Sequence, residues 1–186
     1  MKHSLMLIFI LGLMVTGFGC KIVDPLLIAL NLPLEVSARI NNGNTWADTA
    51  TYNIANEISN VSTSYLANVQ ATRVSDITVY MPSPPSSGTA SGTIRYALDG
   101  GALTTLATFA NVPFDSLITP GISLGNTSLI TYNSPALINL LAAMQDSTGL
   151  PFITTITVQS NGSSSVPVPQ GTEIRASIHY QVDVTP

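Results

Sequence analysis

The stretch EIRASIHYQVDV, residues 173–184, decides the fold because apolar and polar side chains alternate along all of it. Its apolar set consists of Ile174, Ala176, Ile178, Tyr180, Val182 and Val184. Its polar set consists of Glu173, Arg175, Ser177, His179, Gln181 and Asp183. Successive side chains of a strand point to opposite faces of a sheet, so this period of two predicts a strand with one buried and one solvated face. Such strands are typical of antiparallel sheets.

The same alternation recurs through most of the chain, in segments separated by turn-forming residues. Further strands are predicted over 32–40, 46–54, 73–81, 90–98, 102–109 and 152–159. Many short strands spaced by turns are the pattern of a β-sandwich.

Four stretches carry the turn chemistry. Asn41–Asn44 contains Asn and Gly, which tolerate a positive φ, and Asp99–Gly101 lies between two alternating runs, a strong hairpin signal. Residues 82–88 contain three prolines, each without the N–H that a ladder needs, and predict an exposed loop. The Asn-Gly pair within Ser160–Ser165 predicts another reversal before the last strand.

One helix is predicted to begin at Ser134, which can serve as its N-cap, with Pro135 at the first helical position. Gly149 lies just past its end. Residues 56–68 are predicted to form a loop that includes at most one helical turn. The core-facing stripe of the predicted helix consists of Leu137, Leu140, Leu141 and Met144. The fold class is therefore mainly β: an antiparallel β-sandwich of about seven or eight strands with one short helix, as a single domain over residues 32–186.

The first twenty residues, MKHSLMLIFILGLMVTGFGC, predict export. Lys2 precedes an apolar run over 5–15, and small residues lead to Cys20, which is the pattern of a secretory signal peptide over residues 1–19. The run is shorter than the roughly 20 residues of a membrane-spanning helix. An ordinary secretory signal with an incidental cysteine is the alternative, and a retained membrane helix a second one.

Cys20 is the only cysteine of the chain, and Gly19 directly precedes it. This arrangement resembles the lipobox of bacterial lipoproteins. The resemblance implies cleavage before Cys20 by signal peptidase II, palmitate-type acylation at Cys20, and a lipidated tether over 20–31. In that family an Asp after the cysteine often retains the protein at the inner membrane, so Lys21 favours the outer membrane of the cell envelope.

The composition and charge of the chain argue against some classes of function. Charged residues make up only 9% of the chain and its net charge is −4, while Thr, Ser and Asn are frequent, as suits an exported β protein. The basic residues after the signal peptide are scattered and form no cluster, so nucleic-acid binding is not expected. They are Lys21, Arg39, Arg73, Arg95 and Arg175.

One motif suggests catalysis, but its context argues against it. Gly121–Gly125 matches G-x-S-x-G, and Ser123, Asp146 and His179 follow in the order of a hydrolase triad. The residues after the motif predict strand or loop, whereas a nucleophile elbow leads into a helix. With one histidine after the signal peptide, a zinc site is not expected either. The prediction is a non-enzymatic protein without a cofactor.

The predicted function is therefore binding or scaffolding on the outer membrane, with the membrane itself and an envelope protein or glycan as partners. Trp46, Tyr52 and Tyr65 are the candidate contact residues because exposed aromatic side chains often anchor ligands, although each could instead belong to the core. Low charge and the apolar segment 26–30 leave a second hypothesis, a periplasmic carrier of a lipid or other apolar ligand. A third is a subunit of an envelope assembly joined through edge strands.

Overall fold

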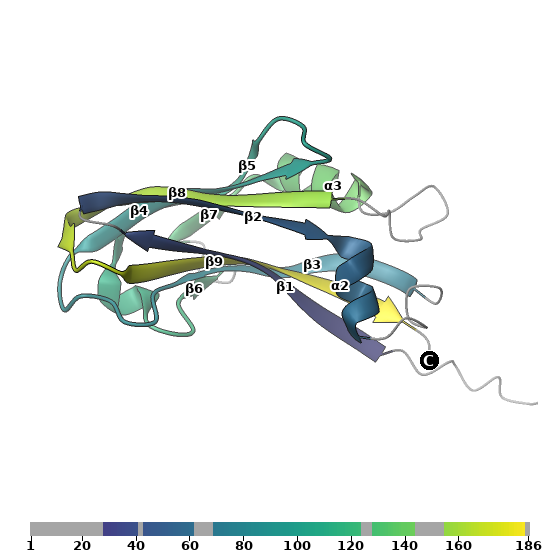
Figure 1. Ribbon diagram of the computed structural model, residues 1–186, viewed down its shortest axis with the longest axis horizontal. Helices are drawn as coiled ribbons and strands as arrows, with labels where there is room; N and C mark the ends of the chain where they lie inside the picture. The colour runs from purple at the N-terminus through teal and green to yellow at the C-terminus, as the bar shows by residue number, and fades with distance from the viewer. Residues whose placement is uncertain (1–27, 41–42, 62–68, 124–127, 144–154, 185–186) are drawn as a thin grey trace, which may run out of the picture.

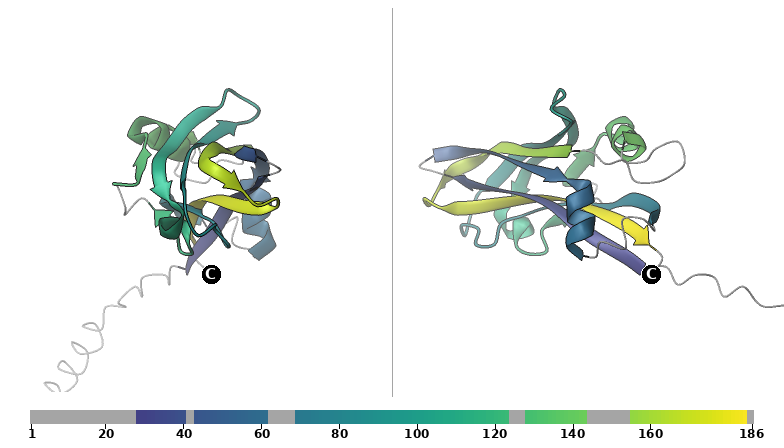
Figure 2. Two further views of the ribbon diagram at one scale, coloured as in Figure 1. Left: turned by 90° about the vertical axis from the view of Figure 1, so that its left-hand side faces the viewer. Right: turned by 45° about the vertical axis from the view of Figure 1, so that its right-hand side comes forward.

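The computed structural model describes residues 28–40, 43–61, 69–123, 128–143 and 155–184. In this part of the chain, nine strands form two antiparallel sheets of four and five strands that face each other (Figures 1 and 2). The mainly β, sandwich-like fold predicted from the alternation is confirmed, with two very short strands raising the count above the prediction.

The four-stranded sheet has the order β1-β9-β3-β6. Its strands are β1 (Ile28–Ile40), β9 (Thr172–Val184), β3 (Val69–Tyr80) and β6 (Ile122–Ser123). The strand that decides the fold, β9, lies between β1 and β3 and pairs with both over nearly its whole length. All six side chains of its apolar set are 0% exposed, as predicted, because the second sheet covers this face.

The five-stranded sheet has the order β2-β8-β4-β5-β7. Its strands are β2 (Gly43–Asn53), β8 (Thr155–Val168), β4 (Thr89–Leu98), β5 (Thr104–Pro113) and β7 (Ile130–Tyr132). The β4–β5 hairpin turns at Asp99 and Gly100, which have φ values of 48° and 75°, as the Asp-Gly signal predicted.

The prediction of a turn at Asn161-Gly162 was wrong. Both residues lie inside β8, which continues without a break to Val168. The chain reverses just after it, where Gly171 has a φ of +83° and the backbone N–H of Thr172 donates to the carbonyl of Pro169 at 3.1 Å. Residue 162 is a glycine in mid-strand because the neighbouring groups leave no room for a Cβ atom there.

Two α-helices accompany the described sheets, α2 (Ile54–Val61) and α3 (Ser134–Ala143), together with the 3-10 helix η2 (Phe114–Leu117). The α2 helix occupies a segment predicted to be the end of a strand followed by a loop with at most one helical turn. The Asn53 side chain caps it by accepting from the backbone N–H of Asn56 at 3.0 Å. The α3 helix was predicted, but its cap is Asn133 rather than Ser134, since Asn133 Oδ1 accepts from the N–H of Ala136 at 3.2 Å.

The start of β1 also differs from the predicted domain boundary. β1 begins at Ile28, inside the segment assigned to the tether, because residues 28–31 continue the pairing with β9 as far as Val184. Cys20 and the predicted signal peptide lie outside the described residues. Among the residues that are described, no helix is both long enough and apolar enough to cross a membrane.

Candidate functional site

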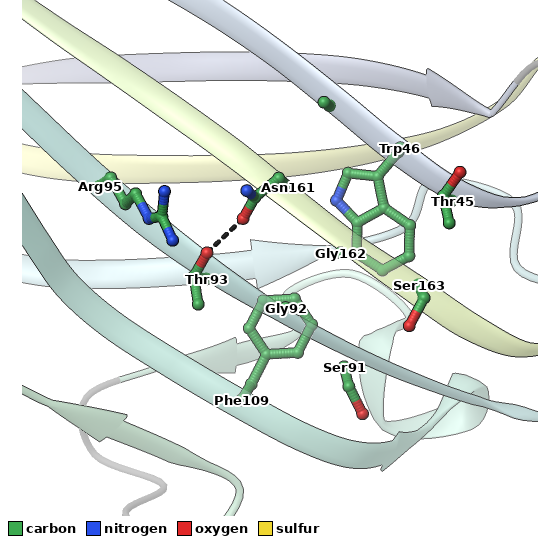
Figure 3. Close-up of a pocket in the computed structure, with 11 residues that line it drawn as sticks. Thr45, Trp46, Ser91, Gly92, Thr93, Arg95, Phe109, Asn161, Gly162 and Ser163 are labelled. Carbon is green, nitrogen blue, oxygen red and sulfur yellow. Dashed lines mark hydrogen bonds between the residues drawn. The ribbon is translucent and has the colours of Figure 1, made fainter. Parts of the chain in front are cut away.

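A shallow groove of about 730 Å³ lies on the five-stranded sheet, across β2, β8, β4 and β5 (Figure 3). Its position on the outer face follows from the alternation along β4. Ile94 is fully buried between the sheets, so Thr93 and Arg95, its neighbours, point outward. The groove is lined by Thr45, Trp46, Ala47, Ser91, Gly92, Thr93, Arg95, Phe109, Asn161, Gly162 and Ser163.

Two glycines form the middle of the groove. Gly92 on β4 lies directly opposite Gly162 on β8 in the pairing register. A Cβ on Gly162 would come within 2.3 Å of the Trp46 ring, and a Cβ on Gly92 within 2.7 Å of the Phe109 ring. The absence of both Cβ atoms lets these rings cross the central strands and stack, with centroids 6.4 Å apart and planes at 15°. The glycine pair therefore thins the sheet at this place.

The outward side chains of the groove are mostly hydroxyls and amides. Thr93 donates its hydroxyl to Asn161 Oδ1, which joins β4 to β8 across the groove (Figure 3). The Ser91 hydroxyl accepts from the backbone N–H of Asn111 at 2.7 Å and so fixes one rim. Each of these groups can still accept or donate a further hydrogen bond.

Arg95 brings the only charge among the described lining residues. Its side chain is half-buried, and its Nε atom is buried without a hydrogen-bond partner in the part of the chain that the structure describes. The indole Nε1 of Trp46 is a second buried donor without a partner there. In the view of Figure 3, Asn161 lies between these two side chains. Buried donors normally have partners, so the groove holds unused hydrogen-bonding capacity.

The three candidate contact residues that were predicted from the sequence differ in where they lie in the structure. Trp46 is only 4% exposed and belongs to the core, which was the alternative given for it; it nevertheless lines the groove. Tyr52 is half-buried, its hydroxyl donates to the backbone carbonyl of Glu35, and burial raises the pKa of that hydroxyl. Tyr65 lies outside the described residues.

Arg95, Thr93 and Asn161 were not among the predicted site residues. Polar side chains on the wet face of a strand carry no functional signal by themselves. The sequence feature that could have located the groove was glycine. Gly92 and Gly162 both lie within strands of the structure, where glycine often marks a close approach of other groups to the backbone.

The outer face of the four-stranded sheet is different, because two of its arginines pair with carboxylates. Arg73 Nη1 lies 2.7 Å from Asp183 Oδ2, and Arg175 contacts Glu35 at 3.4 Å and Glu173 at 3.0 Å. A hydrogen bond from the Ser37 hydroxyl, with the Arg175 guanidinium, lowers the pKa of Glu173. The Arg73–Asp183 and Arg175–Glu35 pairs join neighbouring strands and stabilise the sheet.

Ser123, the candidate nucleophile, also lies on this sheet. It belongs to the two-residue strand β6 and pairs with Thr78 of β3, whereas a nucleophile elbow places its serine on a strand-to-helix turn. The His179 Nε2 atom lies 3.0 Å from Thr78 Oγ1, and Asp146 lies outside the described residues. Among the residues that are described, no cluster of three or more His, Cys, Asp or Glu could hold a metal ion.

Comparison of the chain with protein-family models, with curated proteins and with solved structures finds no match. The function of the groove is therefore argued from its geometry.

Proposed function

We propose that this chain is a lipid-anchored, non-enzymatic protein of the bacterial outer membrane that binds or scaffolds through the outer face of its five-stranded sheet. The anchor rests on the lipobox-like sequence ending at Cys20. The observation that carries the binding role is the groove with its uncompensated Arg95.

The position of the groove suits an anchored protein. Ile28 pairs with Val184 at one end of the sandwich, whereas Thr45 pairs with Ser163 near the other end (Figure 1). β1 contains 13 residues and therefore extends over about 40 Å at the usual rise of a strand. With acyl chains on Cys20, shortly before β1, the groove would lie in the half of the domain farther from the membrane.

The groove also favours recognition over transport of an apolar ligand. A carrier needs an apolar space that removes its ligand from water. The groove is shallow and open, and hydroxyl, amide and guanidinium groups lie among its apolar lining atoms, while the apolar side chains of the two described sheets pack against one another.

Metabolic labelling with an alkyne fatty acid tests the anchor. We expect wild-type chain to take up the label and to fractionate with the outer membrane, and Cys20→Ser chain to lose both properties. Lys21→Asp keeps the thiol and serves as the matched control; it should be labelled but shift toward the inner membrane, as the lipoprotein resemblance implies. Label on Cys20→Ser chain, or none on wild type, would refute the anchor.

A further inference from the structure

We infer that the groove binds an oligosaccharide that carries carboxylates, with Arg95 as the group that pairs with a sugar carboxylate. The inference rests on the proposed binding role and specifies the chemistry of its ligand. Three properties of the groove support it: a cation without a carboxylate partner among the described residues, a set of hydroxyl and amide groups along the groove, and central strands that are already paired on both sides.

The cation requires an anion. Arg95 has no salt bridge within the described residues, unlike Arg73 and Arg175, and its Nε donor is buried without a partner there. A guanidinium offers a planar fork of donors that matches a carboxylate in a bidentate geometry. No carboxylate is among the described residues that line the groove, so an incoming anion meets no repulsion from them.

The neighbouring side chains suit a polyhydroxyl ligand. Thr93 and Asn161 lie near Arg95, and Thr45, Ser91 and Ser163 place further hydroxyls at the other end of the groove (Figure 3). A hydroxyl both donates and accepts, as do the hydroxyls of a sugar, so the two sets can hydrogen-bond in several ways. The volume of about 730 Å³ lies within the usual range of ligand pockets.

The backbone argues against an extended acidic peptide. Peptides that bind to sheets do so by adding a strand to an edge, through unpaired backbone N–H and C=O groups. The groove centres on β8 and β4, and each of these strands has a paired neighbour on both sides. The free edge of β2, the edge strand that borders the groove, lies on the side away from β8 and β4. Specificity at this place must therefore come from side chains.

The single tryptophan of the chain provides the readout, because Trp46 lines the groove. Full-length protein in detergent is titrated with trigalacturonate, and with maltotriose and a glutamate-rich peptide as comparisons, while Trp46 emission is followed; calorimetry gives the affinity independently. We expect trigalacturonate to bind and maltotriose to bind at least tenfold more weakly. The affinity for trigalacturonate should fall as salt rises from about 0.05 to about 0.5 M, because salt screens a partly exposed charge pair.

Two variants and two controls locate the site. Arg95→Gln should weaken trigalacturonate binding roughly tenfold to hundredfold, the usual value of a charge-assisted hydrogen bond. Ser163→Glu should do the same by repulsion, and its exposed side chain leaves the fold intact. Arg73→Gln, on the other sheet, and Thr51→Glu, exposed on β2 outside the groove, should bind like wild type.

Each result decides between the inference and its rivals. Equal binding of the acidic and neutral sugars, preference for the peptide, no binding at all, or unchanged affinity in Arg95→Gln would overturn it. Cys20→Ser chain should bind trigalacturonate like wild type. Wild-type chain that takes up no label but binds trigalacturonate would refute the anchor alone, and labelled wild-type chain that does not bind trigalacturonate would refute the ligand alone.

Discussion

Replacing Gly162 with alanine tests the idea that the glycine pair lets Trp46 cross the sheet. The new Cβ would lie 2.3 Å from Trp46 Cζ2 and 2.3 Å from the backbone oxygen of Ser91, and ordinary contact begins at 3.4 Å. Both neighbours would have to move by more than about 1 Å. The indole is held by its stacking on Phe109, and Ser91 is held by the ladder between β4 and β8, so neither can move freely.

Overpacking of a well-packed core costs about 1–3 kcal/mol. We expect Gly162→Ala to lower the free energy of unfolding by about 3 kcal/mol, the upper end of that range. The backbone contact, unlike a flexible side chain, cannot rotate away.

Gly43→Ala is the matched control. Gly43 lies on β2, the strand that carries Trp46, and nothing would lie within 4 Å of its new Cβ. This variant should be as stable as wild type or up to about 1 kcal/mol more stable, because alanine reduces the entropy of the unfolded chain.

Urea unfolding measures both variants, with Trp46 emission as the probe and circular dichroism as a second one. Equal midpoints for Gly162→Ala and Gly43→Ala would refute the close approach of the ring to the strand. The double variant Gly162→Ala with Trp46→Phe, unfolded in urea and followed by circular dichroism, should recover part of the free energy of unfolding that Gly162→Ala loses. The smaller ring lacks the atoms nearest the new Cβ.

Two further predictions concern β9. Ile178→Ala should lower the free energy of unfolding in urea by about 2–5 kcal/mol, because Ile178 is 0% exposed at the centre of the sandwich; a smaller loss would contradict its place in the core. The Ser37 hydroxyl and Arg175 lower the pKa of Glu173, so this carboxylate stabilises the fold above its ordinary pKa of 4.5 and the stabilisation is lost as pH falls through the lowered value. Melting temperatures measured from neutral pH downward should therefore fall less steeply in acid for Glu173→Gln than for wild type, and parallel curves would show that the pair contributes nothing.

Alternation was sufficient to predict the sheets, because burial of one face imposes a period of two on the sequence. It worked best at Ile174–Val184, where every predicted core residue is buried. It failed where a local signal competed with tertiary packing. Asn161-Gly162 has turn chemistry, but pairing with β2 and β4 on both sides and the Trp46 ring over Gly162 keep it extended. Register with other strands cannot be read from that dipeptide.

The candidate site was harder to predict than the fold. Trp46 was identified as a contact residue, but for exposure that it does not have; it reaches the groove because two glycines, far apart in the sequence, meet in adjacent strands. Arg95 appeared only as one of several scattered basic residues. Its distinction is that it is half-buried and yet has no carboxylate partner within the described chain, which depends on the strand order and register.

Arg175 of the four-stranded sheet and Arg95 of the five-stranded sheet are both half-buried, and each has a buried Nε atom without a partner among the described residues. Only Arg175 pairs with carboxylates, which offset the loss of hydration of its guanidinium. Arg95 has no such offset among the described residues, and a glutamine at its position would avoid that cost and still fit a wet strand face. This difference supports the proposal that Arg95 pairs with an anion that arrives from outside the chain.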